Sequence, residues 1–157
     1  MKIYVVDFEE VLKNYTPYHE SLKKIQNEKQ KFADDIESIK KEMESIVNSS
    51  RSLLLDENTQ RNNANRFKEL QSNAIKLESE FRNDIVELQN SELEKNFKEV
   101  SDIVSDWSAK SDLDLVINKS QTLFVSEQYD ATSVIVEILK EKELYQEYNE
   151  SDFVVEG

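Results

Sequence analysis

The sequence lacks several residues on which common functional sites depend. Its 157 residues include no cysteine, one histidine, one proline and one glycine, Gly157, at the last position. Without cysteine, disulfides and thiolate metal sites are impossible. Without an internal glycine, a phosphate-binding loop, a dinucleotide fingerprint, a nucleophile elbow and an EF-hand cannot be built. We therefore expect a protein that is not an enzyme and that binds no metal or cofactor.

Long apolar runs and clusters of basic residues are missing as well. No stretch approaches the roughly 18 apolar residues that span a bilayer, so membrane insertion is not expected. The formal charge of −13 argues against a nucleic-acid partner, because phosphate backbones attract clustered lysine and arginine. No signal-peptide apolar segment is visible, which predicts a cytoplasmic protein as written and a periplasmic one if a leader has been removed.

Charge is abundant and unevenly placed along the chain. Charged residues make up 34% of the sequence and apolar residues only 38%, which leaves little material for a thick core. Residues 111–157 hold 3 basic and 11 acidic side chains, whereas residues 18–110 hold 15 basic and 19 acidic ones. The acidic excess therefore lies in the C-terminal part, and we expect residues 143–157 to form an acidic, loosely ordered tail.

The strongest pattern is a narrow apolar stripe with helical spacing. Nothing between Pro17 and about Ser50 breaks a helix, since proline is tolerated in the first turn. Spacings of three and four separate eight positions, of which seven are apolar: Leu22, Ile25, Lys29, Phe32, Ile36, Ile39, Met43 and Ile46. This period is typical of a helix that packs one seam against another helix in a coiled coil.

A second helical run carries a matching stripe. Its apolar positions are Phe67, Leu70, Ala74, Leu77, Phe81, Ile85 and Leu88, followed after a gap of five by Leu93, Phe97, Val100, Val104 and Trp107. The gap indicates a register break that changes the covered face of the helix. Poor helix formers at 48–50 and 56–65 predict that the chain turns back there. Together the two runs predict an antiparallel helical hairpin.

Both ends of the sequence have β-type patterns. Residues 3–6 are a short β-branched and aromatic run, residues 113–117 alternate, and residues 122–126 form a third run. We expect the last two to pair through a loop at 118–121, with Asn118 at a positive φ. Strands from the two ends must meet in one sheet, so the helical hairpin is a long insertion into a small body.

The elements in this order resemble the OmpH/Skp family of periplasmic chaperones. The resemblance covers residues 1–142 and is carried by four segments around the charged hairpin: 2–12, 113–117, 123–125 and 130–139. Each segment is short and hydrophobic, and their order and spacing are what make the match specific. The best-known members of that family have basic arms, whereas this chain is acidic.

The resemblance implies an α+β fold class and an assembly. Residues 1–17 and 111–142 would form a body that joins two further copies in a small β-barrel, and residues 18–110 would form a long coiled-coil arm. Six residues would pack the body of this homotrimer: Ile3, Val5, Leu115, Ile117, Leu123 and Val125. Unfolded client proteins would be held among the arms without ATP.

Candidate client-binding residues are apolar side chains without an obvious partner in the seam. They lie at the turn and at the register break: Leu53, Leu54, Leu55, Leu88 and Leu93. Two other functions fit the same sequence. One is a structural or adaptor coiled coil that binds a folded partner through the arm tips, and the other is an acidic mimic that occupies a basic protein surface.

Overall fold

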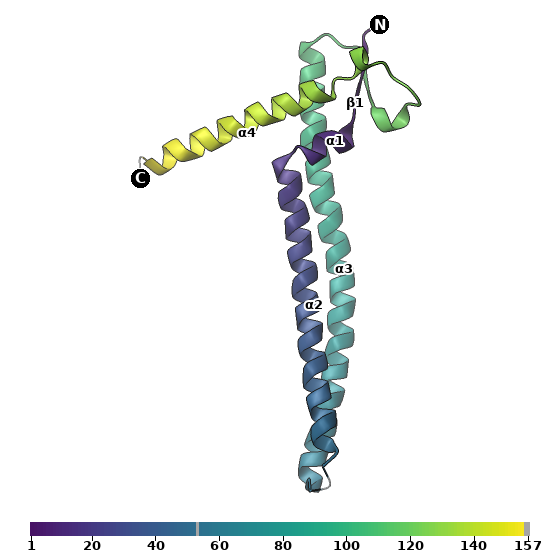
Figure 1. Cartoon of the computed structure of the whole chain (residues 1–157), viewed down its shortest axis with the longest axis vertical. Helices are drawn as coiled ribbons and strands as arrows, with labels where there is room; N and C mark the ends of the chain where they lie inside the picture. Colours follow the sequence, from purple (N-terminus) through teal and green to yellow (C-terminus); the bar gives the residue numbers. More distant parts are fainter. Residues whose placement is uncertain (53, 156–157) are drawn as a thin grey trace. The chain divides into compact units, whose positions relative to one another are not determined.

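The computed structural model describes residues 1–52 and 54–155, and most of these residues are helical (Figure 1). In chain order the elements are β1 (Ile3–Val6), α1 (Phe8–Lys13), α2 (Thr16–Ser50), α3 (Glu57–Lys110), β2 (Leu115–Asn118), the 3-10 helices η1 (Lys119–Gln121) and η2 (Glu127–Tyr129), and α4 (Thr132–Val155). The chain divides into two compact units. The body unit contains residues 1–21 and the chain from Glu92 onward, and the hairpin unit contains Leu22–Ser91.

Strands from the two ends of the chain form the expected common sheet in the body unit. β1 pairs with β2 in parallel, with Ile3 opposite Leu115. On its other edge, the Val5 carbonyl accepts a hydrogen bond of 2.9 Å from the backbone N–H of Ala131. Within the described part of the chain β2 has β1 as its one partner, so its outer edge is unpaired.

The expected third strand at 122–126 is wrong. These residues have no strand structure, and residues 119–121 form η1 instead of a hairpin loop. Asn118 has a φ of −65° rather than a positive one, and its Oδ1 accepts a bond from the Ser120 N–H. The chain leaves β2 through this 3-10 turn. The β-type residues that follow therefore do not return to pair with the edge of β2.

The positive φ occurs instead at Asp112, where α3 ends. Asp112 has a φ of 52°. Among the residues that the structure describes, no other non-glycine residue has a positive φ. The Leu113 N–H donates to the Ser108 carbonyl at 3.0 Å, and the Asp112 N–H donates to the Ala109 carbonyl at 3.4 Å. This pair of bonds is a Schellman motif, in which aspartate takes the left-handed position that glycine usually fills.

The core of the body unit lies among α1, α3, α4 and β1. Its buried apolar side chains are Val6, Val11, Tyr15, Val100, Ile103, Val104, Ala131, Ile135 and Leu139. Asp7 caps α1 by accepting a 3.1 Å hydrogen bond from the Glu10 N–H. The Tyr15 hydroxyl donates to the Glu99 carboxylate, and burial together with this contact raises the pKa of Tyr15.

The hairpin unit confirms the predicted antiparallel pairing of two helices (Figure 1). Arg66 on α3 reaches Glu42 on α2, with Nε and Oε1 2.7 Å apart. The predicted α3 positions from Phe67 to Leu88 are all buried or half-buried, and so are the α2 positions apart from Leu22 and Lys29, which are exposed. Two helices alone cover each other's seam only in part, which explains why most seam side chains are half-buried.

The turn between α2 and α3 is shorter than the sequence predicts. Asp56 caps α3 by accepting a 2.7 Å hydrogen bond from the Thr59 N–H, so residues 57–65 are helical. The Asn63 amide also donates to the hydroxyls of Ser49 and Ser50, at 3.4 and 3.3 Å. Polar contacts across the hairpin thus outweigh the low helix propensity of this stretch.

The register break predicted after Leu88 does not place Leu93 and Phe97 in the seam. Both side chains are exposed, whereas Asn96 is buried and Glu92 is half-buried. Spacings of four from Leu88 lead to Glu92 and Asn96, so the covered face continues through polar residues. Between residues 89 and 97, apolar character alone therefore does not predict which side chains of α3 are buried.

Residues 143–155, where a loose tail was expected, are helical. α4 continues to Val155, and its residues beyond 140 include many good helix formers. At its middle, the Glu143 carboxylate accepts hydrogen bonds of 2.9 Å from both the backbone N–H and the hydroxyl of Thr16. These contacts tie α4 to the start of α2 inside the body unit. Beyond them Leu144, Tyr145 and Tyr148 are exposed.

Candidate functional site

The body unit exposes apolar side chains on and beside its sheet. Leu123 is fully exposed and Phe124 is 85% exposed, on the segment where the third strand was expected. Ile3 and Leu115, which face each other across the two strands, are exposed as well. Exposed apolar residues that gather at an unpaired sheet edge are typical of an interaction surface.

The six residues assigned to the trimer body divide by exposure. Val5 is buried in the body unit, Ile117 and Val125 are half-buried, and the other three are exposed. Val5 therefore already contributes to the fold of one chain. The exposed Ile3, Leu115 and Leu123 are the members of the set that a neighbouring chain could cover.

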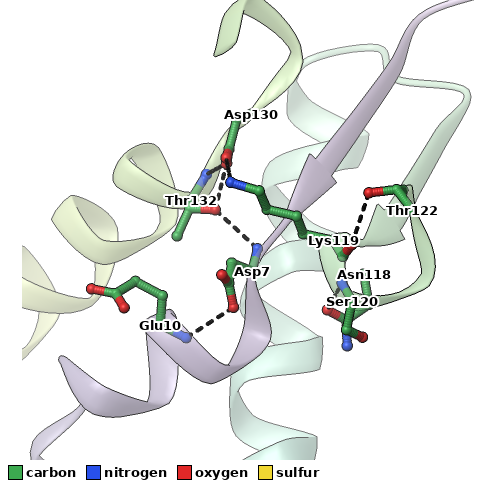
Figure 2. A network of polar contacts seen from close by, with 8 residues as sticks. All are labelled: Asp7, Glu10, Asn118, Lys119, Ser120, Thr122, Asp130 and Thr132. Carbon is green, nitrogen blue, oxygen red and sulfur yellow. Dashed lines mark hydrogen bonds and ion pairs between the residues drawn. The ribbon is translucent and has the colours of Figure 1, made fainter. Parts of the chain in front are cut away.

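A network of polar contacts links separate segments of the body unit to one another (Figure 2). The Lys119 ammonium lies 2.7 Å from Oδ2 of Asp130, and Oδ1 of Asp130 accepts bonds from the backbone N–H and the hydroxyl of Thr132, at 3.0 and 2.5 Å. The Thr132 hydroxyl in turn accepts a 2.9 Å bond from the Asp7 N–H. One chain of contacts thus joins η1, the start of α4 and the end of β1.

The contacts of this network shift the pKa values of Lys119 and Asp130. Burial acts to raise the pKa of Asp130, but the bonds from Lys119 and Thr132 together bring it below its usual value. The contact with Asp130 raises the pKa of Lys119. A groove of about 460 Å³ beside the network is lined mainly by polar and acidic side chains, including Glu10 and Glu137. Lys119, Asp130 and Thr132 bond to one another and to Asp7 inside the unit, so we assign the network to stability and not to binding.

Asp130→Asn is expected to lower the free energy of unfolding by about 1–2 kcal/mol at neutral pH, because it removes the charge that pairs with Lys119. A carboxylate whose folded pKa is lowered stabilises the fold above its unfolded pKa of about 3.9, and that contribution is lost as the pH falls through the folded pKa. The difference from the parent should therefore shrink below about pH 4.

Urea unfolding between pH 3 and pH 7 measures this difference. Glu141→Gln, an equal change at an exposed position of α4, is the control and should have little effect at any pH. A deficit for Asp130→Asn that stays constant down to pH 3 contradicts the assigned charge interaction.

A second polar cluster occupies the seam of the body unit. Asn96 is buried, and its amide donates to the Ser21 hydroxyl at 2.8 Å and to the Glu92 carbonyl at 2.9 Å. The Ser21 hydroxyl donates to the Glu92 carboxylate at 2.6 Å. Oδ1 of Asn96 is buried without a hydrogen-bond partner in the described chain. Buried polar side chains in a helical seam commonly fix its register.

Asn96→Ala should lower the free energy of unfolding by about 1–2 kcal/mol, because the Ser21 and Glu92 acceptors lose their donor inside the seam. Fluorescence of Trp107, which packs against Tyr4 in the same unit, reports the urea transition. Asn83→Ala at an exposed position of α3 is the matched control for helix propensity. Equal transitions for the two variants would remove the structural role of the buried amide.

The hairpin unit contains an apolar groove between α2 and α3. Its volume is about 390 Å³, and the apolar side chains that line it are Phe32, Leu77, Phe81, Ile85 and Leu88. The rings of Phe32 and Phe81 stack with centroids 4.0 Å apart and planes 5° from parallel. Six charged side chains complete the lining: Lys24, Glu28, Lys31, Asp35, Glu80 and Asp84.

The five predicted client-binding residues do not form one patch. Leu88 lines the groove of the hairpin unit, and Leu93 is an exposed residue of the body unit. At the turn, Leu54 is 94% exposed and Leu55 is half-buried, while Leu53 lies outside the described residues. Sequence reasoning placed Phe32 and Phe81 in the seam and did not assign them to a site. Their facing positions on two antiparallel stripes were the signal that could have indicated the groove.

Two other classes of site can be checked in the described residues. Residues 1–52 and 54–155 include no helix with the length and apolar character needed to cross a bilayer. The same residues contain no group of three or more histidine, cysteine, aspartate or glutamate side chains placed to hold a metal ion. We therefore consider the apolar surfaces of the two units as the candidate sites.

Comparison with known proteins identifies the family. A family model described as outer membrane protein (OmpH-like) matches residues 2–139, which is most of the chain and covers the hairpin unit and the body unit up to Leu139. The search of curated proteins gives no significant match. The resemblance found in the sequence is confirmed, and the chain belongs to the OmpH-like outer membrane protein family, which includes chaperones.

Proposed function

We propose that the chain is an ATP-independent holdase-type chaperone that works as a homotrimer. It binds unfolded or non-native proteins between the helical hairpins of three chains. The family match over residues 2–139 carries this proposal, because the OmpH-like family includes non-enzymatic chaperones. The absence of any internal glycine fits a mechanism without nucleotide, since a glycine-rich phosphate loop cannot be built.

The exposed surface of the body unit supports assembly. The outer edge of β2 has no partner strand in the described chain, and Leu123 and Phe124 are exposed to solvent on the segment that follows η1. An open edge with adjacent apolar side chains pairs readily with another chain. In a closed trimer, a neighbouring chain would cover the outer edge of β2, and no open edge would remain.

The hairpin unit supports holding by many weak contacts. Its half-buried seam leaves apolar area at the surface, and the stacked pair Phe32 and Phe81 lies in an open groove. Each such contact is weak, but three hairpins that engage one client add their contributions. The net charge of −13 keeps the loaded complex soluble.

An aggregation assay tests the proposal. Several unrelated proteins are diluted from denaturant with and without the purified chain at one trimer per client, and light scattering is recorded. We expect scattering to fall for most clients in the absence of ATP. If none of them is protected, the holdase function must be abandoned.

A structural or adaptor coiled coil is the second candidate, and one observation favours it. Leu54, at the turn of the hairpin unit, is 94% exposed and could dock on a folded partner. Leu54→Ser separates the two functions, because an adaptor would lose its partner while a holdase with many contacts would protect clients almost as well as the parent.

A further inference from the structure

The groove of the hairpin unit is lined by more acidic than basic side chains. Four carboxylates line it, from Glu28, Asp35, Glu80 and Asp84, against the two ammonium groups of Lys24 and Lys31. The lining is therefore net negative around an apolar floor. Each helix contributes two of the carboxylates, but both lysines lie on α2, so the acidic excess comes from Glu80 and Asp84 on α3.

The floor of the groove suits an apolar side chain. The stacked rings of Phe32 and Phe81 are half-buried, so one part of each ring is available to a ligand. A volume of about 390 Å³ is within the lower range of ligand pockets, on the order of 300–1,000 Å³, and accommodates side chains but no folded element. Aromatic faces also attract cations, which adds to the effect of the surrounding carboxylates.

We infer that this groove binds unfolded segments in which an aromatic or aliphatic residue is flanked by lysine or arginine, so that the preferred clients are cationic. The inference rests on the proposed holding function and specifies its client class. Apolar contact with the Phe32 and Phe81 pair supplies affinity, and the carboxylates select against anionic flanks. The net charge of the whole chain, −13, also favours cationic clients, because it raises the rate at which they encounter the protein.

Fluorescent peptides of one length test the charge selection. One peptide has phenylalanine flanked by lysine, the second has phenylalanine flanked by glutamate, and the third has serine flanked by lysine. Fluorescence anisotropy with the full chain at low salt should give a Kd for the first peptide at least about tenfold below that of either other peptide. Added salt should reduce the difference in Kd between the lysine-flanked and the glutamate-flanked phenylalanine peptides.

A pair of charge reversals on α3 tests the location. Asp84→Lys reverses a charge in the groove, and Glu87→Lys makes the same change at an exposed position that does not line it. Circular dichroism confirms that both variants fold. We expect Asp84→Lys to weaken binding of the lysine-flanked peptide several-fold and Glu87→Lys to change it much less.

Two results overturn the inference. They are equal affinities for the lysine-flanked and glutamate-flanked peptides, and equal effects of the two reversals, which would mean that only net charge matters. Either result alongside protection in the aggregation assay leaves the holdase function intact. Loss of protection for every unfolded protein instead overturns the holdase function itself.

Discussion

The double variant Leu123→Glu, Phe124→Glu is expected to dissociate into monomers. In the proposed trimer these two side chains leave water for an apolar interface, and carboxylates at that interface would have to be desolvated without partners. Light scattering during size-exclusion chromatography should give about three times the 18.4 kDa chain mass for the parent and about one chain mass for the variant. Both measurements are made at the same micromolar concentration.

Leu54→Glu is the matched control for this prediction. It places one carboxylate, where the double variant places two, on a similarly exposed leucine at the turn of the hairpin unit. The control should remain a trimer, and circular dichroism should show unchanged helix content for both variants. A double variant that keeps the parent mass would exclude residues 122–126 from the interface. A parent that is monomeric at micromolar concentration would contradict the proposed assembly altogether.

The periodic parts of the fold could be predicted from the sequence. Spacings of three and four placed the α2 stripe and the α3 stripe up to Leu88, and the structure confirms nearly all of these positions. The shared sheet followed from β-type runs at opposite ends of the chain, which had to meet. Such patterns are local and repeat several times, so that one exception such as the exposed Lys29 does not obscure them.

The parts that depend on tertiary contacts could not be predicted. Residues 122–126 have β-type composition, but a strand needs a partner edge, and the 3-10 turn at 119–121 directs the chain elsewhere. Glu92 and Asn96 are polar, so hydrophobic spacing passed over them in favour of Leu93 and Phe97. Buried polar residues of this kind are visible only after their hydrogen-bond partners have been located.

The candidate site was predictable only in its ingredients. Phe32 and Phe81 were assigned to their stripes, but a groove depends on the separation of two helices and on which charges surround it. The sequence placed the acidic excess in residues 111–157 and did not indicate the acidic side chains around this groove. The set Leu53, Leu54 and Leu55 was chosen for its hydrophobicity near a turn, and its contribution to client binding stays a prediction.

Ile135→Ala is expected to destabilise the body unit by about 2–5 kcal/mol. Ile135 is 0% exposed and belongs to the core cluster with Val6, Val11 and Val100. Truncation removes buried methyl and methylene groups and leaves a cavity, because the surrounding backbone relaxes only in part. Small domains have unfolding free energies of about 5–15 kcal/mol, so this loss is a large share of the total.

Trp107 fluorescence in urea measures the effect, because this tryptophan packs against the same core cluster. The midpoint should move to lower urea, and all samples need the same chain concentration since assembly contributes to apparent stability. Val134→Ala at the neighbouring exposed position of α4 is the control and should cost less than about 0.5 kcal/mol. If both variants shift the midpoint equally, α4 does not complete this core. A large shift for Ile135→Ala alone would confirm that α4 completes the core through its buried face.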